Sequence, residues 1–398
     1  MKFSKRLILI ALLLLALFVQ TLPATAFAGV LNHDELDAVP WTEFDIQQEL
    51  MPEVTMAAGA LVTQDGRILW SRDIDTRRAP ASLTKIMTAV LAIENLDADE
   101  EFTLPAMPLG YRESRAFLRQ GDILTREQLL QSLLLVSGND AAQAIAVAVA
   151  GDLPSFVELM NERAAELGMS NTNFRDASGL DFHDQYSSAR DLATLARFAM
   201  SLPDFREVAG TIETSFTTNR ATHDLDNTNI LLQSYDGATG VKTGRTTGAG
   251  FSLILSAERN DLELFAIVLG TGAELTRFFE ARALLDFGFT HYRDQKLALE
   301  NTVVSNAPVV NFPDRTVQVA VSQDITIPVL DIAGTVEQSI DIAELRSPVR
   351  RGDEVGYMTF VQRGRMIARV PLIATQDVNN PFFLVQWYYN ALIAWRNR

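Results

Sequence analysis

Lysine is scarce in this 398-residue chain, and its placement is the feature that most constrains the fold. Beyond the first thirty residues only three lysines occur, and two of them, Lys85 and Lys242, lie inside short motifs. Arginine stays protonated in proteins, whereas a buried lysine can lose its proton and act as a base. We therefore expect a fold that brings three distant motifs into one site. They are S-x-x-K, S-x-N and K-T-G in that order: Ser82-Leu83-Thr84-Lys85, Ser137-Gly138-Asn139 and Lys242-Thr243-Gly244.

The N-terminus has the pattern of an export signal. A basic start precedes a nearly unbroken apolar run at residues 7–19, and Ala26-Phe27-Ala28 offers a small-x-small cleavage site. The run is shorter than the roughly 20 residues that a membrane-spanning helix needs. We therefore predict a cleaved signal peptide at residues 1–28 and an exported protein. An uncleaved leader would instead tether the protein by its N-terminus.

Composition excludes several kinds of function. The chain contains no cysteine, which excludes disulfides, zinc–thiolate sites and cysteine nucleophiles. Its formal net charge is −16, so neither nucleic acid nor anionic lipid headgroups are expected as main partners. The four histidines show no metal-ligand spacing, and His183 and His223 are interpreted as solvated loop residues. We predict no metal and no other cofactor.

Local patterns predict the elements that carry the motifs. Alternating apolar residues on either side of Asp65-Gly66 indicate a β-hairpin at residues 58–71, and Pro80 precedes a helix whose first turn holds Ser82. A capping-box pattern at residues 125–128 begins a leucine-rich helix that runs to 136. We expect an α+β domain in which helices cover both sides of an antiparallel sheet. Its further elements are helices at 140–150, 156–167 and 276–287 and strands at 240–244, 251–256 and 262–270.

The C-terminal third of the chain has a different texture. Short β-rich runs between residues 298 and 376 indicate a small all-β module, with hairpin connections at 353–354 and 363–365. The tail at 381–398 crowds aromatic and aliphatic side chains around a narrow polar stripe. We favour an amphipathic helix that associates with a membrane surface. A helix packed on the β module and a contact between two copies are the alternatives.

The first motif has the groups that a serine nucleophile needs. Ser82 and Lys85 are three residues apart on the expected helix, so their side chains share one face. A serine at a helix N-terminus lies beside free backbone N–H groups, which stabilise an oxyanion. Lys85 can accept the serine proton if burial and a second cation, Lys242, lower its pKa.

The other two motifs supply polar groups for a substrate. Ser137 is predicted to relay a proton to a departing amine, and Asn139 to hold a substrate amide and orient the lysine of the first motif. Lys242 and Thr243, on an edge strand, offer a cation and a hydroxyl to a substrate carboxylate. Gly244 has no side chain, so a substrate backbone can approach.

These segments resemble those of penicillin-binding proteins of the D-alanyl-D-alanine carboxypeptidase type, low-molecular-mass serine peptidases of family S11. The resemblance is carried by residues 80–89, 137–142 and 236–250 and extends over about residues 40–290. It implies a penicillin-binding, β-lactamase-like transpeptidase fold. The domains we expect are a signal peptide at 1–28, a serine peptidase domain at 29–295, a β-rich domain at 296–377 and an amphipathic membrane-association helix at 378–398.

The resemblance also implies a reaction. Members of the family remove the terminal D-alanine from peptidoglycan stem pentapeptides through an acyl-enzyme, and penicillins acylate them at the extracytoplasmic face of the bacterial cell membrane. By correspondence, Ser82 is the nucleophile and Lys85 the general base, with Ser137 and Asn139 in the second motif. The backbone N–H groups of Ser82 and of Arg245, where many relatives carry histidine or an aromatic residue, would form the oxyanion hole. A further correspondence assigns the substrate carboxylate to Arg277.

Three other functions remain open. A serine β-lactamase shares the motifs but uses a glutamate in an E-x-x-L-N loop, and the nearest candidate, at 158–161, falls in an apolar-periodic helix. A DD-endopeptidase is chemically closer, although such relatives often lack the C-terminal β module. A non-catalytic wall-binding or antibiotic-sensing protein is disfavoured because every motif residue is intact.

Overall fold

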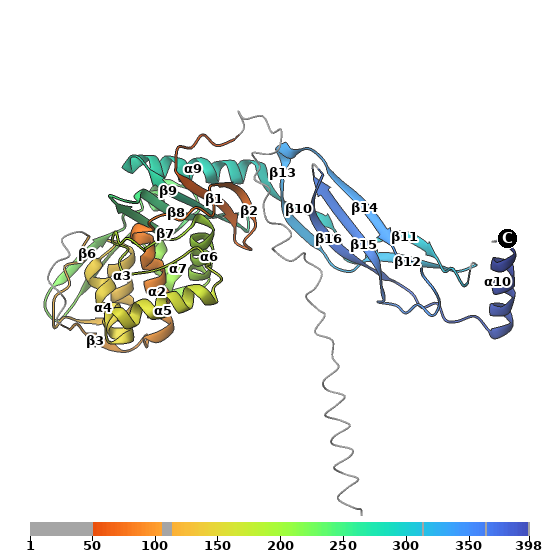
Figure 1. The fold of residues 1–398 in the computed structure, drawn as a ribbon, viewed down its shortest axis with the longest axis horizontal. Coiled ribbons are helices and arrows are strands. Elements are labelled where there is room, and N and C mark those ends of the chain that lie inside the picture. The colour runs from red at the N-terminus through yellow and green to blue at the C-terminus, as the bar shows by residue number, and fades with distance from the viewer. Residues whose placement is uncertain (1–50, 106–113, 313, 363, 397–398) are drawn as a thin grey trace, which may run out of the picture. The chain divides into compact units, whose positions relative to one another are not determined.

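The computed structural model describes residues 51–105, 114–312, 314–362 and 364–396. The predicted signal peptide lies outside these residues. The described chain forms two compact units, one ending at Arg293 and one starting at Asp294, with Leu330–Ile332 belonging to the first (Figure 1). The predicted α+β class is confirmed.

The first unit is built on a five-stranded antiparallel sheet in the order β2-β1-β9-β8-β7. The third motif lies on β7, which is an edge strand as predicted. The strands of this sheet are β1 (Ala58–Thr63), β2 (Ile68–Arg72), β7 (Ala238–Thr246), β8 (Gly250–Arg259) and β9 (Leu262–Thr271). Two small hairpins pair β3 (Glu101–Thr103) with β4 (Ile123–Thr125), and β5 (Glu213–Thr217) with β6 (Thr222–Asp226).

Helices cover both faces of this sheet, so that β1 is buried along its whole length. The helix α9 (Glu274–His291) lies on one face, and α2 to α7 lie on the other (Figure 1). The capping box is confirmed: the Thr125 hydroxyl accepts from the Gln128 N–H, and the Gln128 side chain accepts from the Thr125 N–H. The remaining helices are α2 (Lys85–Asn95), α3 (Arg126–Leu134), α4 (Asn139–Ala150), α5 (Leu153–Glu166), α6 (Ala189–Met200), α7 (Pro203–Gly210) and α8 (Leu231–Ser234).

The second unit contains a five-stranded sheet in the order β11-β12-β16-β15-β14 and a pair formed by β10 and β13. Its core is aliphatic and aromatic, with Val317, Val370 and Leu372 fully buried. The strands are β10 (Tyr292–Ala298), β11 (Val303–Pro308), β12 (Thr316–Val321), β13 (Ile325–Leu330), β14 (Val336–Ile342), β15 (Glu354–Gln362) and β16 (Arg365–Ala374). The predicted all-β character of this region is confirmed.

Two features of the second unit differ from the prediction. Strand β14 was not predicted, although Val336, Ile340 and Ile342 alternate with polar residues; five of its seven residues are exposed. The predicted hairpin connection at Asp353-Glu354 is wrong, since Glu354 is the first residue of β15. Strand β15 pairs with β14 across the long connection 343–353, and the short turn that contains Gly364 joins it to β16.

The C-terminal tail forms the helix α10 (Phe383–Arg396). Phe383 and Trp387 are more than two-thirds exposed, whereas Tyr389 is buried, donates a hydrogen bond to Asp314 and contacts the ring of Phe312. In the described part of the chain no single helix is long and apolar enough to cross a membrane. Only α4 and α5 together meet that test, and they are bent by 85°.

Candidate active site

Ser82 lies on a 3₁₀ turn, η5 (Ala81–Thr84), that leads directly into α2. The turn begins with Ala81 at φ +51°, a left-handed conformation that side chains other than glycine rarely adopt. Gly179 packs so closely here that a Cβ atom would lie 1.7 Å from the Ala81 carbonyl oxygen. The serine is thus placed at the N-terminus of α2, as predicted, by a strained turn that a neighbouring loop holds in position.

Lys85 is fully buried, and its amine contacts the serine. Its Nζ donates to Ser82 Oγ at 3.1 Å, to Asn139 Oδ1 at 2.8 Å and to the Ser178 carbonyl at 2.8 Å. Burial lowers the pKa of Lys85 to about 7, against the opposing effect of the Asp176 and Asp140 carboxylates. A substantial fraction of the amine is therefore neutral near pH 7 and able to accept a proton.

Lys242 is also buried, at 1 % exposure, and its Nζ donates to the Thr243 carbonyl at 3.2 Å. Burial, followed by the charges of Lys85 and Arg277, lowers the pKa of Lys242 well below its usual value. Burial is confirmed as the main cause of the Lys85 shift, and the repulsion between the two lysines is mutual, so it disfavours protonation of both amines at once.

The second motif lies between α3 and α4 in a constrained conformation. Ser137 has φ +61° and is buried, and its Oγ has no hydrogen-bond partner among the described residues. Asn139 starts α4 and accepts from Lys85, as predicted for the orienting role. Asp140 accepts from the backbone N–H groups of Ala116 and Leu118, which fixes the neighbouring segment against the motif.

The third motif, on the edge strand β7, lies next to the serine turn, the turn η5 that carries Ser82. The Thr243 and Thr228 hydroxyls lie 2.7 Å apart. A Cβ atom at Gly244 would lie 3.3 Å from both Ala81 Cβ and Leu83 Cγ. Gly244 therefore has a second reason to be glycine besides substrate approach, because the serine turn packs directly on it.

Sequence reasoning missed the loop at residues 176–179, whose backbone binds the Lys85 amine. Ser178 contributes its backbone carbonyl, which no side-chain motif reveals. The Asp176 carboxylate accepts from the N–H groups of Ser178 and Gly179 and from the Gln185 amide. Thr88 on α2 donates to the Ala177 carbonyl at 2.7 Å. The one available signal was the Asp-x-Ser-Gly pattern, which is typical of an Asx turn.

The interpretation of His223 as a solvated loop residue is wrong. It lies on β6, is buried and stacks on Phe216 with ring centroids 5.2 Å apart. Its Nδ1 lies 3.0 Å from the Ala116 carbonyl oxygen. His183 is exposed, as predicted. Across the described residues, no group of three or more acidic, histidine or cysteine side chains could hold a metal ion.

Comparisons with known proteins place this geometry in a family. The family model described as D-alanyl-D-alanine carboxypeptidase, peptidase S11, matches residues 47–273. The chain belongs to this family. A second model, for the C-terminal domain of penicillin-binding protein 5, matches residues 292–380. The resemblance inferred from the three motifs is confirmed, and the protein is a serine D-Ala-D-Ala carboxypeptidase.

Relatives of this carboxypeptidase cover most of its length. The D-alanyl-D-alanine carboxypeptidase DacF of Bacillus subtilis is 30 % identical over 337 residues, which cover 82 % of this chain and 87 % of that protein. DacC of Escherichia coli is 31 % identical over 369 residues, covering 86 % and 89 %. The crystal structure of DacD from Francisella tularensis matches with a TM-score of 0.72 at 26 % identity, covering 85 % of this chain and 97 % of that one. The family acts on peptidoglycan peptides and binds β-lactams.

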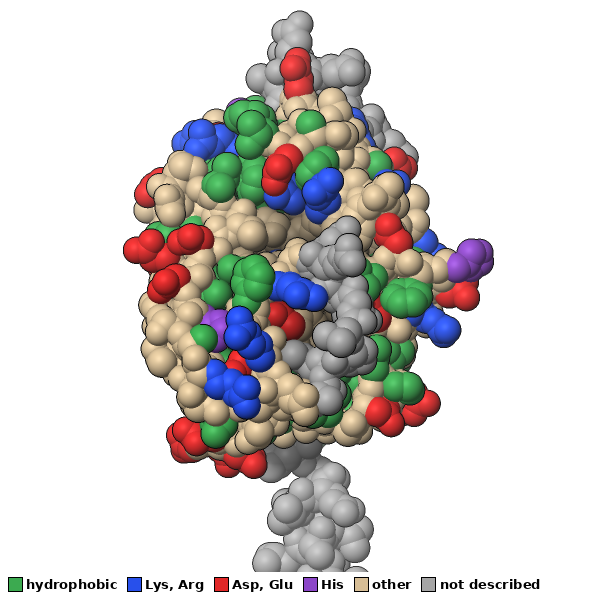
Figure 2. All heavy atoms as spheres, turned by 90° about the vertical axis from the view of Figure 1, so that its left-hand side faces the viewer, with side chains coloured by type: hydrophobic (Ala, Val, Ile, Leu, Met, Phe, Trp, Pro, Cys, Tyr) green, Lys and Arg blue, Asp and Glu red, His purple; other side chains and the backbone are tan. Residues whose placement is uncertain are grey.

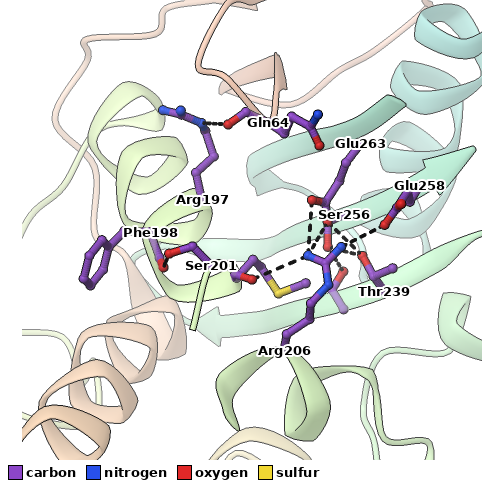
Figure 3. A network of polar contacts seen from close by, with 11 residues as sticks. Gln64, Arg197, Phe198, Ser201, Arg206, Thr239, Ser256, Glu258 and Glu263 are labelled. Carbon is purple, nitrogen blue, oxygen red and sulfur yellow. Dashed lines mark hydrogen bonds and ion pairs between the residues drawn. The ribbon is translucent and has the colours of Figure 1, made fainter. Parts of the chain in front are cut away.

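The edge strand of the carboxypeptidase is held by a polar network where β7 begins (Figure 3). Arg206 on α7 donates to Glu263 on β9 and Glu258 on β8, each at 2.9 Å. The hydroxyls of Thr239 on β7 and Ser256 on β8 lie 2.7 Å apart. This network fixes β7 next to a register shift, three residues before the buried lysine of the third motif.

Two arginines flank the third motif. Arg245 is exposed on β7, with its Cζ 5.2 Å from the centroid of the Phe251 ring. Arg277, in the first turns of α9, is 5 % exposed and lies over the same ring at 5.6 Å. It donates to the Gly244 carbonyl at 3.1 Å and to Glu274 at 3.2 Å. Arg245 and Arg277, the two predicted site residues outside the motifs, thus both lie beside the third motif.

Proposed function

We propose that this carboxypeptidase removes the terminal D-alanine from peptidoglycan stem pentapeptides through an ester on Ser82, and that penicillins acylate the same serine. The observation that carries the proposal is the 3.1 Å contact between Lys85 Nζ and Ser82 Oγ, together with a Lys85 pKa of about 7. A general base works best when its pKa lies near the working pH.

Acylation proceeds by attack of Ser82 Oγ on the carbonyl carbon of the penultimate D-alanine, while the serine proton passes to the neutral amine of Lys85. The backbone N–H groups of Ser82 and Arg245 hold the oxyanion. When the C–N bond breaks, Lys85 gives up the proton that it took from Ser82; this proton passes through the Ser137 hydroxyl to the departing amine, which leaves as D-alanine. The buried Ser137 Oγ, which lacks a partner among the described residues, is available for this transfer.

Deacylation returns the enzyme to its starting state. A water molecule attacks the ester carbon, its proton passes to Lys85, and the shortened peptide leaves with a new carboxylate while Ser82 recovers its hydrogen. The edge strand β7 is open to a substrate backbone, which would add to the sheet beside Thr243 and Gly244. The Asn139 amide, held by Lys85, would bind a peptide group of the substrate.

Mass spectrometry with diacetyl-L-lysyl-D-alanyl-D-alanine and, separately, with benzylpenicillin tests this function. We expect release of one D-alanine from the peptide and a long-lived penicilloyl adduct on the protein, both absent in Ser82→Ala. Rapid penicillin turnover without peptide cleavage would instead identify a β-lactamase. Cleavage of cross-linked but not of linear peptides would identify an endopeptidase.

Residues 158–161 give no support to the β-lactamase alternative. Glu158 is exposed on α5, and Asn161 binds the backbone of Phe174 through both its amide nitrogen and its oxygen. These residues therefore have a structural role in joining α5 to the following segment. The long-lived adduct is the expected outcome of the penicillin experiment.

The location we propose is the extracytoplasmic face of the bacterial cell membrane, reached with the signal peptide at 1–28 and kept through α10. The exposed rings of Phe382, Phe383 and Trp387 support contact with a lipid interface. Flotation with phosphatidylcholine vesicles tests this, with Trp387→Glu expected to weaken binding and Ile340→Glu, on the exposed strand β14, as the matched control. Equal flotation of both variants would contradict the proposal.

A further inference from the structure

Lys242 must project from the side of β7 that faces Lys85 if the two lysines are to share one site. Both lysines are buried, and the sequence of the first unit contains no third lysine. Figure 2 shows the face of this unit that lies at the left of Figure 1, and the Lys and Arg side chains around its middle are therefore arginines. The position of the Lys242 amine is thus set inside the molecule, by the course of the strand that carries it.

Strand β7 contains a β-bulge just before the third motif. Ala238 lies opposite Ala257 on β8, but Gly240 already lies opposite Ser256. Gly240 has φ +133°, in the left-handed region that favours glycine. Two residues of β7, Thr239 and Gly240, therefore oppose the single residue Ser256, which is the arrangement that defines a bulge.

The bulge decides which face of the sheet receives the lysine of the third motif. Side chains alternate between the two faces of a strand, so one extra residue moves every following side chain to the opposite face. Lys242 lies opposite Ile254, which belongs to the same core as the buried residues of α2. Two residues later, a Cβ atom at Gly244 would lie 3.3 Å from two side chains of the serine turn. Without the extra residue, Lys242 would project toward the face that α9 covers, away from Lys85.

Both residues of the bulge are held by their neighbours (Figure 3). The Thr239 hydroxyl lies 2.7 Å from Ser256 Oγ and 3.4 Å from Glu263 Oε1. The Ser256 hydroxyl also lies 3.4 Å from the Gly240 carbonyl oxygen. Helix α7 packs so closely here that a Cβ atom at Gly240 would lie 2.9 Å from the Ala209 carbonyl oxygen. Hydrogen bonds thus hold the first residue of the bulge, and packing against α7 holds the second.

Arg206 on α7 compensates the carboxylates of this network. Glu258 and Glu263 lie directly opposite each other on β8 and β9, and Glu263 is buried. Like charges in such a position destabilise a sheet, and a buried carboxylate needs a partner. One guanidinium nitrogen of Arg206 donates to the two Glu263 oxygens at 2.9 and 3.2 Å, and another donates to Glu258 at 2.9 Å. Arg206 therefore keeps the Glu263 carboxylate in place beside the Thr239 hydroxyl.

We propose that Arg206, Glu263 and Thr239 are positioning residues for the acylation reaction. They hold the bulge of β7, so that Lys242 lies on the side of the sheet that carries Lys85. This inference rests on the proposed function, and it gives a part in the reaction to residues outside the three motifs that act through β7. Catalysis is sensitive to such placement, because displacement of a group by about 1 Å can slow a reaction about 10²-fold.

A double-mutant cycle tests whether the network acts through Lys242. Thr239→Val keeps the branched shape of the side chain and removes its hydroxyl, and we expect it to slow acylation by benzylpenicillin about tenfold. In a Lys242→Gln background the same substitution should change the rate by less than about twofold, because the effects of residues that act as a unit are not additive. Thr239→Ser keeps the hydroxyl and should stay within about twofold of the wild-type rate.

Arg206→Gln is a second variant of the same network. We expect it to slow acylation about tenfold in the wild-type background and less than about twofold beside Lys242→Gln. Arg197→Gln is the matched control from the same region (Figure 3). The Arg197 side chain donates to the Gln64 carbonyl at 2.9 Å, on the connection between β1 and β2, so its loss should leave the rate within about twofold.

Three outcomes of the cycle would overturn the inference. Thr239→Val could leave the rate of the wild-type background unchanged, or it could slow acylation by the same factor in both backgrounds, as a general loss of structure would. Thr239→Ser could also prove as slow as Thr239→Val. Failure of the proposed function would look different, because the wild-type protein would then form no penicilloyl adduct on Ser82.

Discussion

The two units differ in the number and charge of the polar side chains that they bury. Among the described residues of the second unit, only Ser347 and Gln362 are buried polar side chains. The first unit buries two lysines and an arginine at one site, and the non-glycine residues with positive φ around that site are Ala81, Ser114, Phe117 and Ser137. Buried charge and strained backbone both cost stability. Their concentration around Ser82 indicates that the first unit gives up stability there for chemistry, whereas the core of the second unit is almost wholly apolar.

Substituting one lysine in each unit should give the largest difference in acylation rate between the two units. Lys85→Arg replaces the base with a group that stays protonated, so we expect acylation by benzylpenicillin to fall by about 10³-fold. Lys296→Arg is the matched control, because this half-exposed lysine of the second unit pairs with Asp324 and should change the rate by less than about twofold. Similar rates in the two variants would contradict a special role for the buried lysine.

Truncating a core side chain of the second unit should lower the unfolding free energy and leave the acylation rate nearly unchanged. Phe360 is 2 % exposed, and Phe360→Ala is expected to lower the unfolding free energy by about 3–5 kcal/mol. Chemical denaturation followed by circular dichroism measures this loss. The penicillin acylation rate of the folded variant should stay within about twofold of the wild type. A proportional loss of acylation would show that the second unit contributes to the site.

The contact between the edge strand and the serine turn gives a smaller effect. In Gly244→Ala the new methyl group would press on Ala81 and Leu83 at 3.3 Å, so the turn must shift by a few tenths of an ångström. We expect acylation to slow by about tenfold. Gly272→Ala, where a Cβ atom meets nothing within 4 Å, is the control. Equal rates in the two variants would mean that the turn tolerates displacement.

Much of this fold was predictable because its elements carry local signals. The capping box at Thr125, the turn at Asp65-Gly66 and the ordered motifs each depend on side chains close in sequence. Strand β14 carries only a weak signal of this kind, because its alternating pattern of Val336, Ile340 and Ile342 is interrupted by Gln338 and five of its seven residues are exposed. His223 was misread for a related reason: its burial comes from Phe216 and Ala116, which only tertiary structure brings to it.

The sequence predicted which residues form the site, but it did not predict how deeply each of them is buried. The motifs identify Ser82, Lys85 and Lys242, yet they say nothing of the Ser178 carbonyl that binds the Lys85 amine. They also do not show that Lys242 is buried while Arg245 stays exposed. Backbone acceptors and degrees of burial arise from packing between distant segments, so one-dimensional patterns cannot report them.

The most direct test of the account is the pH dependence of acylation by benzylpenicillin in the wild-type protein. Lys85 accepts the serine proton only when neutral, and its pKa is about 7. The rate constant should therefore rise about tenfold per pH unit between about pH 5 and pH 7 and level off above that range. A rate that does not change over this range, or that keeps rising toward the ordinary lysine pKa of about 10.4, would contradict the claim that buried Lys85 activates Ser82.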